Sequence, residues 1–502
     1  MRGGTALTIF HLKKAAIVIA VLLLFVGSVL PCAAESFDTN NCYTYTSSSD
    51  VVPDRPIYEP VRYVTGVQAG SDKWSLPEDL FVYNNKFYIA DTANQRIVVL
   101  DEELNFLFEI AQLHNDSGSG RLSNPVGVFA NECGILICDL GAQRAVLTDE
   151  QGNVLQTYEK PSTAVLENTV FKPTKAVMDE YHNVYILASG VYQGFMQYDL
   201  DGVFQGFFGS NTIEVSASLV LSRFWKKFFG NDAAKSMARD IPLEYNNAFI
   251  DQNGFIYATI YQTSTGSNNL KRLNARGYNI LQHLQDGNAL DRNRYGDQYQ
   301  QIIKGTIWRT NLLDVTVDEH GVITVLDGTW GRLFQYNSDG DLLGVFGGPG
   351  STLGRFASAS SLVEKDGKYY VLDKITGSIT VFKPTTYRDL LGQALVYYEK
   401  GEYQESINMW QEVLKYNSSI TLAYKSIGKA YMQQQNLEIA LEYLKKAEDR
   451  ESYSMVLGQL RQQFFQKNIW WLLVVAVVFV VALRFCLRAF SRWLRHEKKL
   501  SR

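Results

Sequence analysis

The stretch YIADTANQRI, residues 88–97, decides the fold of this 502-residue chain. A run of apolar and aromatic residues ends at Asp91, a polar loop follows, and a second apolar run begins after Arg96. Short runs of this composition, bounded by Asn, Asp and Gly, are typical of β-strands. The spacing of an aspartate and an arginine five residues later returns in two further places. The three pairs are Asp91 and Arg96, Asp139 and Arg144, and Asp327 and Arg332.

Around this loop lies a longer unit that occurs six times. Each copy contains a short strand after a proline or small residue, a turn of Asn, Asp or Gly, a second strand, the loop and a third strand. A fourth strand follows in some copies, as at residues 203–208 and 342–346. Repeats of four short strands at this spacing form the blades of β-propellers. The six copies cover residues 74–101, 122–149, 171–202, 241–277, 313–339 and 356–382.

We therefore predict a mainly β fold with a six-bladed β-propeller over residues 58–384. Residues 61–67 should supply the outer strand of the last blade, because a closed propeller hides both sheet edges. Residues 88–97 resemble the NHL-repeat signature YVADxxNxRI, and the likeness extends over residues 62–383. In NHL repeats the aspartate and the arginine brace the loop between strands. The resemblance thus implies that the three Asp/Arg pairs are structural.

Two insertions interrupt the repeats. The first, at about residues 210–240, has apolar residues near helical spacing and predicts an amphipathic helix. That helix is either a lid or docking surface, or it packs on the propeller rim. The second, residues 278–311, is rich in charged and aromatic residues, which either line a ligand site or belong to a solvated loop. Its candidate ligand residues are Arg292, Tyr295 and Asp297.

After residue 384 the period of the apolar residues changes from two to that of a helix. Small and aromatic residues recur 34 positions apart, which resembles tetratricopeptide repeats, where small residues let paired helices pack closely. We predict two such repeats and a capping helix over residues 386–466, which either grip a peptide or serve as a spacer. The packing residues are Ala394, Tyr397, Gly401, Gly428, Tyr431, Ala440 and Ala447.

Two apolar segments indicate a membrane protein. Residues 1–34 have the pattern of a signal peptide, with cleavage expected after Ala34 and an uncleaved anchor as the alternative. Residues 35–57 are expected to be a linker. Residues 469–487 predict a single transmembrane helix with two tryptophans at its outer end. The tail, residues 488–502, is basic, which predicts a cytoplasmic C-terminus and an ectodomain outside the cell membrane.

Charge and cysteine content narrow the function classes. The whole chain has a net charge of −4, but both ends are basic, so residues 35–467 carry −13. This acidic body argues against a nucleic-acid-binding protein. Cys133 and Cys138 fall in one strand-like run at a spacing that points them to opposite faces. We interpret them as small buried hydrophobic residues rather than a disulfide or a metal pair.

The sequence contains no spacing of histidines typical of a metal site and no nucleophile or phosphate-loop motif. His182 and His320 fall in turns, where we expect them to be exposed. We therefore expect no catalytic residue, no metal and no cofactor. Because NHL-type propellers include metal-dependent enzymes, the resemblance keeps one alternative open. That alternative is a lactonase-like hydrolase or lyase acting on an extracellular small molecule.

The order of the segments favours a membrane-anchored binding or scaffold protein with the propeller as its interaction platform. It resembles NHL and tetratricopeptide proteins of Gram-positive bacteria that accompany carbohydrate ABC transporters. The resemblance implies a role in sugar uptake or in envelope assembly, with a protein partner, for which a transporter complex is one candidate, and a carbohydrate as the candidate ligand. A structural spacer is the further alternative.

Overall fold

The structure is a computed structural model of the whole chain. It describes residues 42–46, 51–115, 118–210, 244–260, 269–281, 295–297, 301–303 and 306–500. The predicted signal peptide (1–34), the predicted helical insertion (about 210–240) and Arg292 lie outside these residues.

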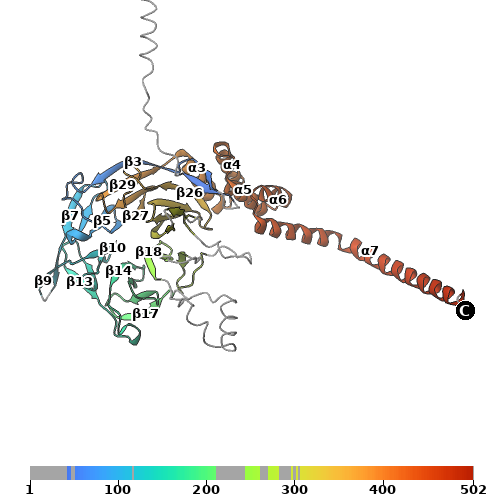
Figure 1. Cartoon of the computed structure of the whole chain (residues 1–502), viewed down its shortest axis with the longest axis horizontal. Helices are drawn as coiled ribbons and strands as arrows, with labels where there is room; N and C mark the ends of the chain where they lie inside the picture. Colours follow the sequence, from blue (N-terminus) through green and yellow to red (C-terminus); the bar gives the residue numbers. More distant parts are fainter. Residues whose placement is uncertain are drawn as a thin grey trace, which may run out of the picture. The chain divides into compact units, whose positions relative to one another are not determined.

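Six small antiparallel sheets follow one another along the chain, and together they form the propeller (Figure 1). Blade one contains β4 (Asp79–Tyr83), β5 (Lys86–Asp91), β6 (Arg96–Leu100) and β7 (Phe106–Ile110). Blade two contains β10 (Pro125–Asn131), β11 (Gly134–Asp139), β12 (Arg144–Thr148) and β13 (Val154–Tyr158). Blade three contains β14 (Pro173–Met178), β15 (Val184–Ala188), β16 (Phe195–Tyr198) and β17 (Phe204–Phe208).

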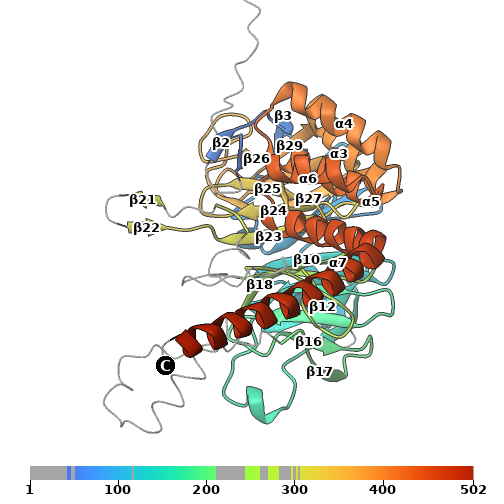
Figure 2. The same cartoon turned by 90° about the vertical axis from the view of Figure 1, so that its right-hand side faces the viewer.

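The other three blades complete the ring. Blade four contains β18 (Tyr245–Ile250), β19 (Ile256–Ile260) and β20 (Leu270–Leu273). Blade five contains β23 (Leu312–Val317), β24 (Ile323–Asp327), β25 (Arg332–Tyr336) and β26 (Leu342–Gly347), which lie side by side in Figure 2. Blade six contains β27 (Ala359–Lys365), β28 (Lys368–Asp373), β29 (Ser378–Pro384) and β3 (Tyr58–Thr65). The prediction of six blades is confirmed.

The first strand of each blade is the innermost one, and these six strands form a closed ring. β4 contacts β10, the series continues through β14, β18 and β23 to β27, and β27 contacts β4 again. The outermost strand of blade six, β3, comes from the start of the propeller and pairs with β29 from Thr65 opposite Ser378 to Tyr58 opposite Pro384. The predicted closure by an N-terminal strand is therefore confirmed, and it completes blade six as a four-stranded sheet.

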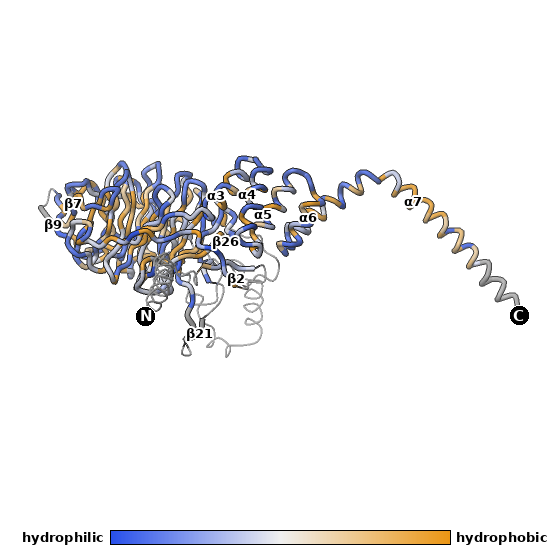
Figure 3. The backbone as a smooth tube through the Cα atoms, turned by 90° about the horizontal axis from the view of Figure 1, so that it is seen from above, coloured by the Kyte–Doolittle hydropathy of each residue, from blue (hydrophilic) through white to orange (hydrophobic). Residues whose placement is uncertain are grey.

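Apolar side chains fill the space between neighbouring blades. The middle strands of the blades are mostly buried, and β6 and β19 are buried along their whole length, because sheets cover both of their faces. In Figure 3 the blade strands carry hydrophobic residues through the interior of the propeller. Aromatic residues contribute much of the volume, which explains their abundance in the sequence. The fully buried rings in the propeller include Trp74, Phe87, Tyr158, Phe195, Tyr257, Phe334, Phe346 and Phe382.

Short hairpins and 3₁₀ helices lie outside the six blade sheets. Within residues 35–57, where the sequence predicts a linker, β1 (Tyr43–Tyr45) and β2 (Val51–Pro53) form a hairpin, and β1 packs against β26. Two further hairpins are β8 (Gln112–Asn115) with β9 (Gly118–Arg121), and β21 (Gln301–Ile303) with β22 (Thr306–Trp308). Two single-turn 3₁₀ helices are η2 (Thr92–Asn94) and η3 (Ala164–Leu166).

A helical region follows the last blade strand. It contains α3 (Thr386–Glu399), α4 (Tyr403–Tyr416), α5 (Thr421–Gln433), α6 (Leu437–Lys446) and α7 (Arg450–Leu500). The helices α3 and α4 pack as a pair, as do α5 and α6. The predicted capping helix and the predicted transmembrane segment are both parts of α7. The described residues contain one helix long and apolar enough to cross a membrane, within residues 450–491, and its second half is hydrophobic in Figure 3.

Candidate functional site

One position recurs in all six innermost strands and gathers polar side chains at one end of the propeller. In each blade it pairs with the second-last residue of the second strand, as Asp79 does with Ala90 and Lys175 with Leu187. In five blades a register shift in the inner strand directly precedes it. We call these residues the inner ring, and they are Asp79, Gly127, Lys175, Asn247, Asp314 and Ser361.

Four members of the inner ring bond to one another across the propeller axis, although they come from blades one, three, five and six. The Lys175 ammonium donates to both carboxylate oxygens of Asp79 at 2.7 Å. The Ser361 hydroxyl lies 2.6 Å from Asp314 Oδ2 and 3.2 Å from Asp79 Oδ1, so it bridges the two carboxylates. All four side chains are buried. Residues 47 to 282 positions apart thus form one polar network.

Backbone amides complete this network. Val128 N donates to Asp79 Oδ2 and Leu362 N donates to Asp314 Oδ2, both at 2.8 Å. Each of these donors stands one residue after the inner-ring position of its own blade. The network therefore satisfies its charges with groups from neighbouring blades, which a buried carboxylate requires.

The electrostatics of the inner ring follow from burial and from an imbalance of charge. Burial by itself would lower the pKa of Lys175, but the charges of Asp79 and Asp314 outweigh it and raise the pKa of this ammonium group. Burial, with the charge of Asp79 adding to it, raises the pKa of Asp314 to about 6, although Lys175 opposes the shift. Two carboxyl groups thus face one lysine in the inner ring.

Four polar groups of the inner ring are bonded to one another, so they stabilise the contact between blades and are not free to bind a ligand. The ammonium group of Lys175 is engaged by a carboxylate, and the hydroxyl of Ser361 is shared between two. Removing one partner of a buried ion pair costs about 3–5 kcal/mol of stability. The four bonded side chains therefore stabilise the arrangement of the four blades that carry them. The six ring positions contain neither histidine nor cysteine. In the described part of the chain, the inner ring presents carboxylate, amide, hydroxyl and ammonium groups alone.

The Asp/Arg pairs of the sequence motif occupy equivalent places in their blades. Each aspartate ends the second strand and pairs in register with the residue that begins the third strand, as Asp91 does with Arg96. In blade one the pair is an ion pair, with Arg96 Nε 2.8 Å from Asp91 Oδ2. Asp91 also accepts the amide of Ser75, 2.7 Å away, and so braces the loop that leads into the blade.

The other two pairs differ from blade one in what the arginine does. Asp139 accepts the amides of Ser123 and Asn124, but Arg144 Nε is buried without a hydrogen-bond partner among the described residues. Asp327 accepts the amide of Asn311 at 2.9 Å. Asp373, whose register partner is a serine, accepts two such amides in blade six. In blades two and five the aspartate therefore braces the loop without a hydrogen bond from the arginine Nε, and in blade six a serine stands at the arginine position.

The predicted ligand loop is divided between described and undescribed residues. Arg292 lies outside the described residues. Tyr295 and Asp297 are buried, with exposed fractions of 3% and 6%. Asp297 forms an ion pair with Arg332 and accepts hydrogen bonds from Tyr43 and Tyr45 of the β1–β2 hairpin. Asp297 thus joins an N-terminal hairpin to blade five. Sequence reasoning missed this role because its partners come from places 35 to 254 residues away.

The predicted packing residues of the helical region lie where helices meet or turn. Ala394 is fully buried, and Ser406 of the next helix donates to its carbonyl oxygen at 2.7 Å. A Cβ atom on Gly428 would come within 2.7 Å of Leu444, so α5 and α6 need a glycine at this contact. Ala440 and Ala447 are buried, Tyr397 and Tyr431 are partly buried, and Gly401 lies in the turn after α3.

The two cysteines of the strand-like run separate in the structure. Cys138 is fully buried in β11, as predicted. Cys133 precedes that strand, in the turn between β10 and β11, and is only partly buried. The prediction that both lie along one strand is therefore wrong for Cys133, because Gly134 is the residue that begins β11. His182 lies in a turn and is partly exposed, and His320 lies in a turn and is exposed, as expected.

Comparisons with known proteins add little to this picture. No family model matches the chain, and no curated protein matches it. Among solved structures, virginiamycin B lyase from Staphylococcus aureus has 9% identity and a TM-score of 0.39, covering 65% of this chain and 100% of that chain. The extracellular domain of a one-component system from B. thetaiotaomicron has 8% identity and a TM-score of 0.37, covering 68% and 38%. PorZ, a surface component of the type-IX secretion system of Porphyromonas gingivalis, has 14% identity and a TM-score of 0.32, covering 60% and 40%.

Proposed function

We propose that this chain is a membrane-anchored extracytoplasmic binding or scaffold protein whose NHL-type propeller is an interaction platform. The observation that carries the proposal is the core that the blades share with the helical region. Residues of blade five, blade six, α3, α4 and α5 belong to one continuous apolar cluster, which includes Phe346, Phe382, Leu391, Trp410 and Ile427. A propeller fused in this way to the helices does not swing on a linker.

Polar contacts strengthen the junction. Arg388 of α3 donates from Nε to Gln335 Oε1 at 2.5 Å and lies 3.7 Å from the carboxylate of Asp318. Lys425 of α5 forms an ion pair with Asp341 at 2.6 Å. Lys429 of the same helix reaches Asp339 at 2.9 Å. These polar pairs surround the apolar contact between blade five and the helices, and together they favour one fixed position of the helices on the propeller.

The anchor in this proposal is α7. Trp470 and Trp471 are exposed and stand just before the apolar stretch, where aromatic side chains favour the membrane interface. The basic residues after Leu483 support a cytoplasmic C-terminus, and the propeller then lies outside the cell membrane. The helices before α7, which we regard as tetratricopeptide-like, connect the platform to this anchor.

The free face of the platform follows from the direction of the strands. Asp318, Asp339 and Asp341, which contact the helices, all lie in turns at the end of blade five where the innermost strand finishes. The loops at the other end, where the innermost strands begin, carry exposed apolar side chains. They are Val67, Leu76, Val165, Val170, Tyr192, Leu353 and Ile375. Because four polar groups of the inner ring at that same end are bonded to one another, we infer that a protein partner binds these outer loops instead.

Site-specific photocrosslinking in cells tests the proposal. A photoreactive residue replaces Leu76 or Ile375 in the full-length protein, and Tyr181, which is 78% exposed in a turn at the opposite end, is the matched control position. We expect a crosslinked protein partner from the two loop positions and none from the control. Crosslinks from Tyr181 alone, or from no position, would contradict the proposal. A carbohydrate-transporter permease among the partners would support the transporter-accessory role.

The structure also changes how the helical region and the ligand loop must be tested. Deletion of α3 to α6 would expose the core that these helices share with blades five and six, so it would not isolate a docking function. Substitution of Tyr295 would disturb its buried ring contact with Tyr336 of blade five, and substitution of Asp297 would disturb its ion pair with Arg332. Binding of glycans by the full-length protein in detergent, compared with an Arg292→Ala variant, is the cleaner test of a carbohydrate ligand.

A further inference from the structure

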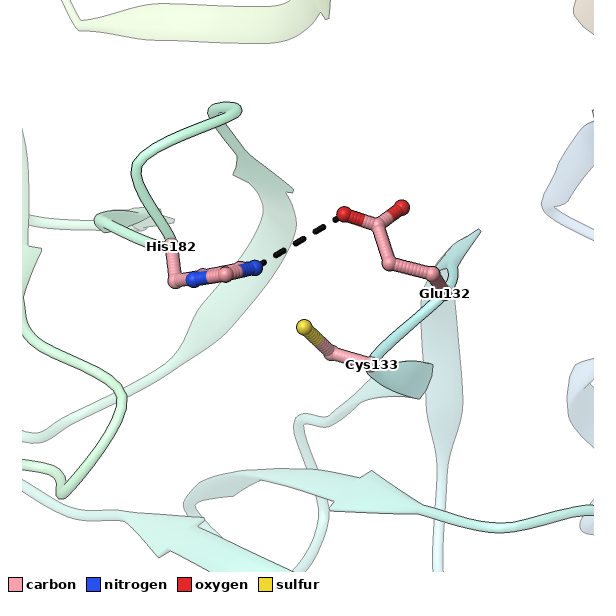
Figure 4. Close-up of side chains that lie close together, drawn as sticks. All are labelled: Glu132, Cys133 and His182. Atoms are coloured by element: carbon pink, nitrogen blue, oxygen red, sulfur yellow. Dashed lines mark ion pairs between the residues drawn. The ribbon is translucent and has the colours of Figure 1, made fainter.

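Two turns of neighbouring blades bring a carboxylate, a thiol and an imidazole together at the end of the propeller opposite the inner ring. Glu132 and Cys133 form the tight turn between β10 and β11, and His182 lies in the turn between β14 and β15. One ligand atom from each residue lies within 4.8 Å of the others. Figure 4 shows the three side chains pointing toward one another, with His182 Nε2 3.7 Å from Glu132 Oε1.

We propose that Glu132, Cys133 and His182 bind one zinc ion, with a fourth position open to water. Thiolate, imidazole and carboxylate are the ligands that zinc prefers, and three protein ligands with one open position are typical of an accessible zinc site. In tetrahedral coordination two such ligand atoms stand roughly 3.4–3.6 Å apart, given metal–ligand distances of about 2.0–2.3 Å. The 3.7 Å between His182 Nε2 and Glu132 Oε1 is close to this spacing, and Cys133 Sγ lies within 4.8 Å of both atoms. This proposal does not rest on the proposed scaffold function.

The backbone at His182 supports the assignment independently of these distances. His182 N donates to Asp179 O, and its φ angle is +64°. The same amide-to-carbonyl turn recurs six times in blades two to five with glycine in the matching place of the turn, at φ angles between +73° and +82°, and once in blade one with Leu104, at a φ angle of +68°. These glycines are Gly152, Gly202, Gly254, Gly277, Gly321 and Gly340. A side chain in this left-handed conformation is unfavourable, so the turn by itself favours glycine over histidine.

The turns also hold the donor atoms in place. Asp179 Oδ1 accepts the amides of Tyr181 and Asn183, which fixes the loop that carries His182. The Cys133 amide donates to Asn131 Oδ1 at 2.9 Å and fixes the other turn. Glu132 is exposed, so its long side chain can adjust to an ion that enters from solvent. A simple ion pair between His182 and Glu132 would not need the thiol beside it.

Zinc and cobalt titrations of the chelator-treated full-length protein in detergent test the proposal. We expect one zinc ion per chain and, with cobalt, the charge-transfer absorption of a thiolate ligand. Cys133→Ser should abolish that absorption. His182→Gly should weaken zinc binding at least about tenfold while the thermal midpoint of the metal-free protein stays equal or rises, because glycine relieves the turn.

The matched control is His320→Ala. His320 Nε2 lies 3.6 Å from Glu319 Oε1, so this pair repeats the histidine–carboxylate geometry without a cysteine. The variant should bind zinc like the unmodified protein, and zinc should raise the thermal midpoint of both. Zinc binding that survives in both Cys133→Ser and His182→Gly, or a stoichiometry far from one, would overturn the proposal.

Discussion

Blade one and blade five contain the same motif in the same register, yet their arginines serve different partners. In blade one, Arg96 Nε binds Asp91 Oδ2 at 2.8 Å. In blade five, the equivalent atoms, Arg332 Nε and Asp327 Oδ2, are both buried without hydrogen-bond partners in the described part of the chain. Arg332 turns instead to Asp297. The comparison teaches that the aspartate is the constant brace of the loop, whereas the arginine is available for contacts outside its blade.

The largest difference in stability loss between the two blades should appear when each arginine is replaced by alanine. Arg332→Ala leaves the buried Asp297 carboxylate without its cation, and such a change costs about 3–5 kcal/mol. Arg96→Ala should cost less, about 1–3 kcal/mol, because Asp91 keeps its bonds to the Ser75 amide and to Asn94. Denaturant unfolding of the full-length protein in detergent measures both losses. Equal losses would mean that the two arginines do the same work.

The next largest effect should be a pH dependence of the free energy of unfolding that comes from Asp327 of blade five. Burial first, and then the charge of Asp297, raises the pKa of Asp327 from 3.8 to about 6. The folded chain therefore holds more protons than the unfolded chain between these values, and the free energy of unfolding falls as the pH rises through this window. Asp327→Asn should remove on the order of 2 kcal/mol of this change, measured between pH 4 and 7.

Asp314 of the inner ring has a shift of the same sign, so part of the pH dependence should remain in the Asp327→Asn variant. A profile identical to that of the unmodified protein would show that Asp327 does not titrate in this range.

A smaller effect on the free energy of unfolding is expected when the contact between the β1–β2 hairpin and Asp297, the partner of Arg332, is weakened. Tyr45 donates its hydroxyl to Asp297 Oδ1 at 3.0 Å, and a hydrogen bond to a carboxylate is worth about 1.5–3 kcal/mol. Tyr45→Phe should therefore lower the free energy of unfolding by about 1.5 kcal/mol. Tyr63→Phe, at a tyrosine that is 46% exposed on β3, is the control and should change it by less than about 0.5 kcal/mol. Equal effects would argue against a role for the hairpin contact.

The smallest effect should come from Arg144 in blade two. Its Nε has no hydrogen-bond partner among the described residues, and Asp139 is held by backbone amides. Arg144→Ala should cost about 1 kcal/mol or less, whereas Asp139→Ala should cost more, because it leaves the amides of Ser123 and Asn124 unpaired. Thermal unfolding of the two variants side by side checks the order. A larger loss of stability for Arg144→Ala than for Asp139→Ala would show that the arginine, not the aspartate, stabilises the loop of blade two.

The sequence predicted the architecture more fully than it predicted the site. Six blades, the closing strand and the apolar C-terminal helix all follow from local periodicity and from internal repetition, which are properties of neighbouring residues. The zinc ligands that we propose were not predicted, because Cys133 and His182 stand in different repeats. A signal for His182 does exist in the sequence, since it replaces the glycine of a repeated turn.

By itself, the sequence determined a mainly β propeller, helices after residue 384, and the place of each motif aspartate at the end of a second strand. Tertiary structure alone decided which groups meet: Lys175 with Asp79, Arg332 with Asp297, and His182 with Glu132 and Cys133. The physical reason is range. Strand and turn formation depend on residues a few positions apart, whereas the pairing of charges and donors depends on how the closed ring of blades places distant residues beside one another.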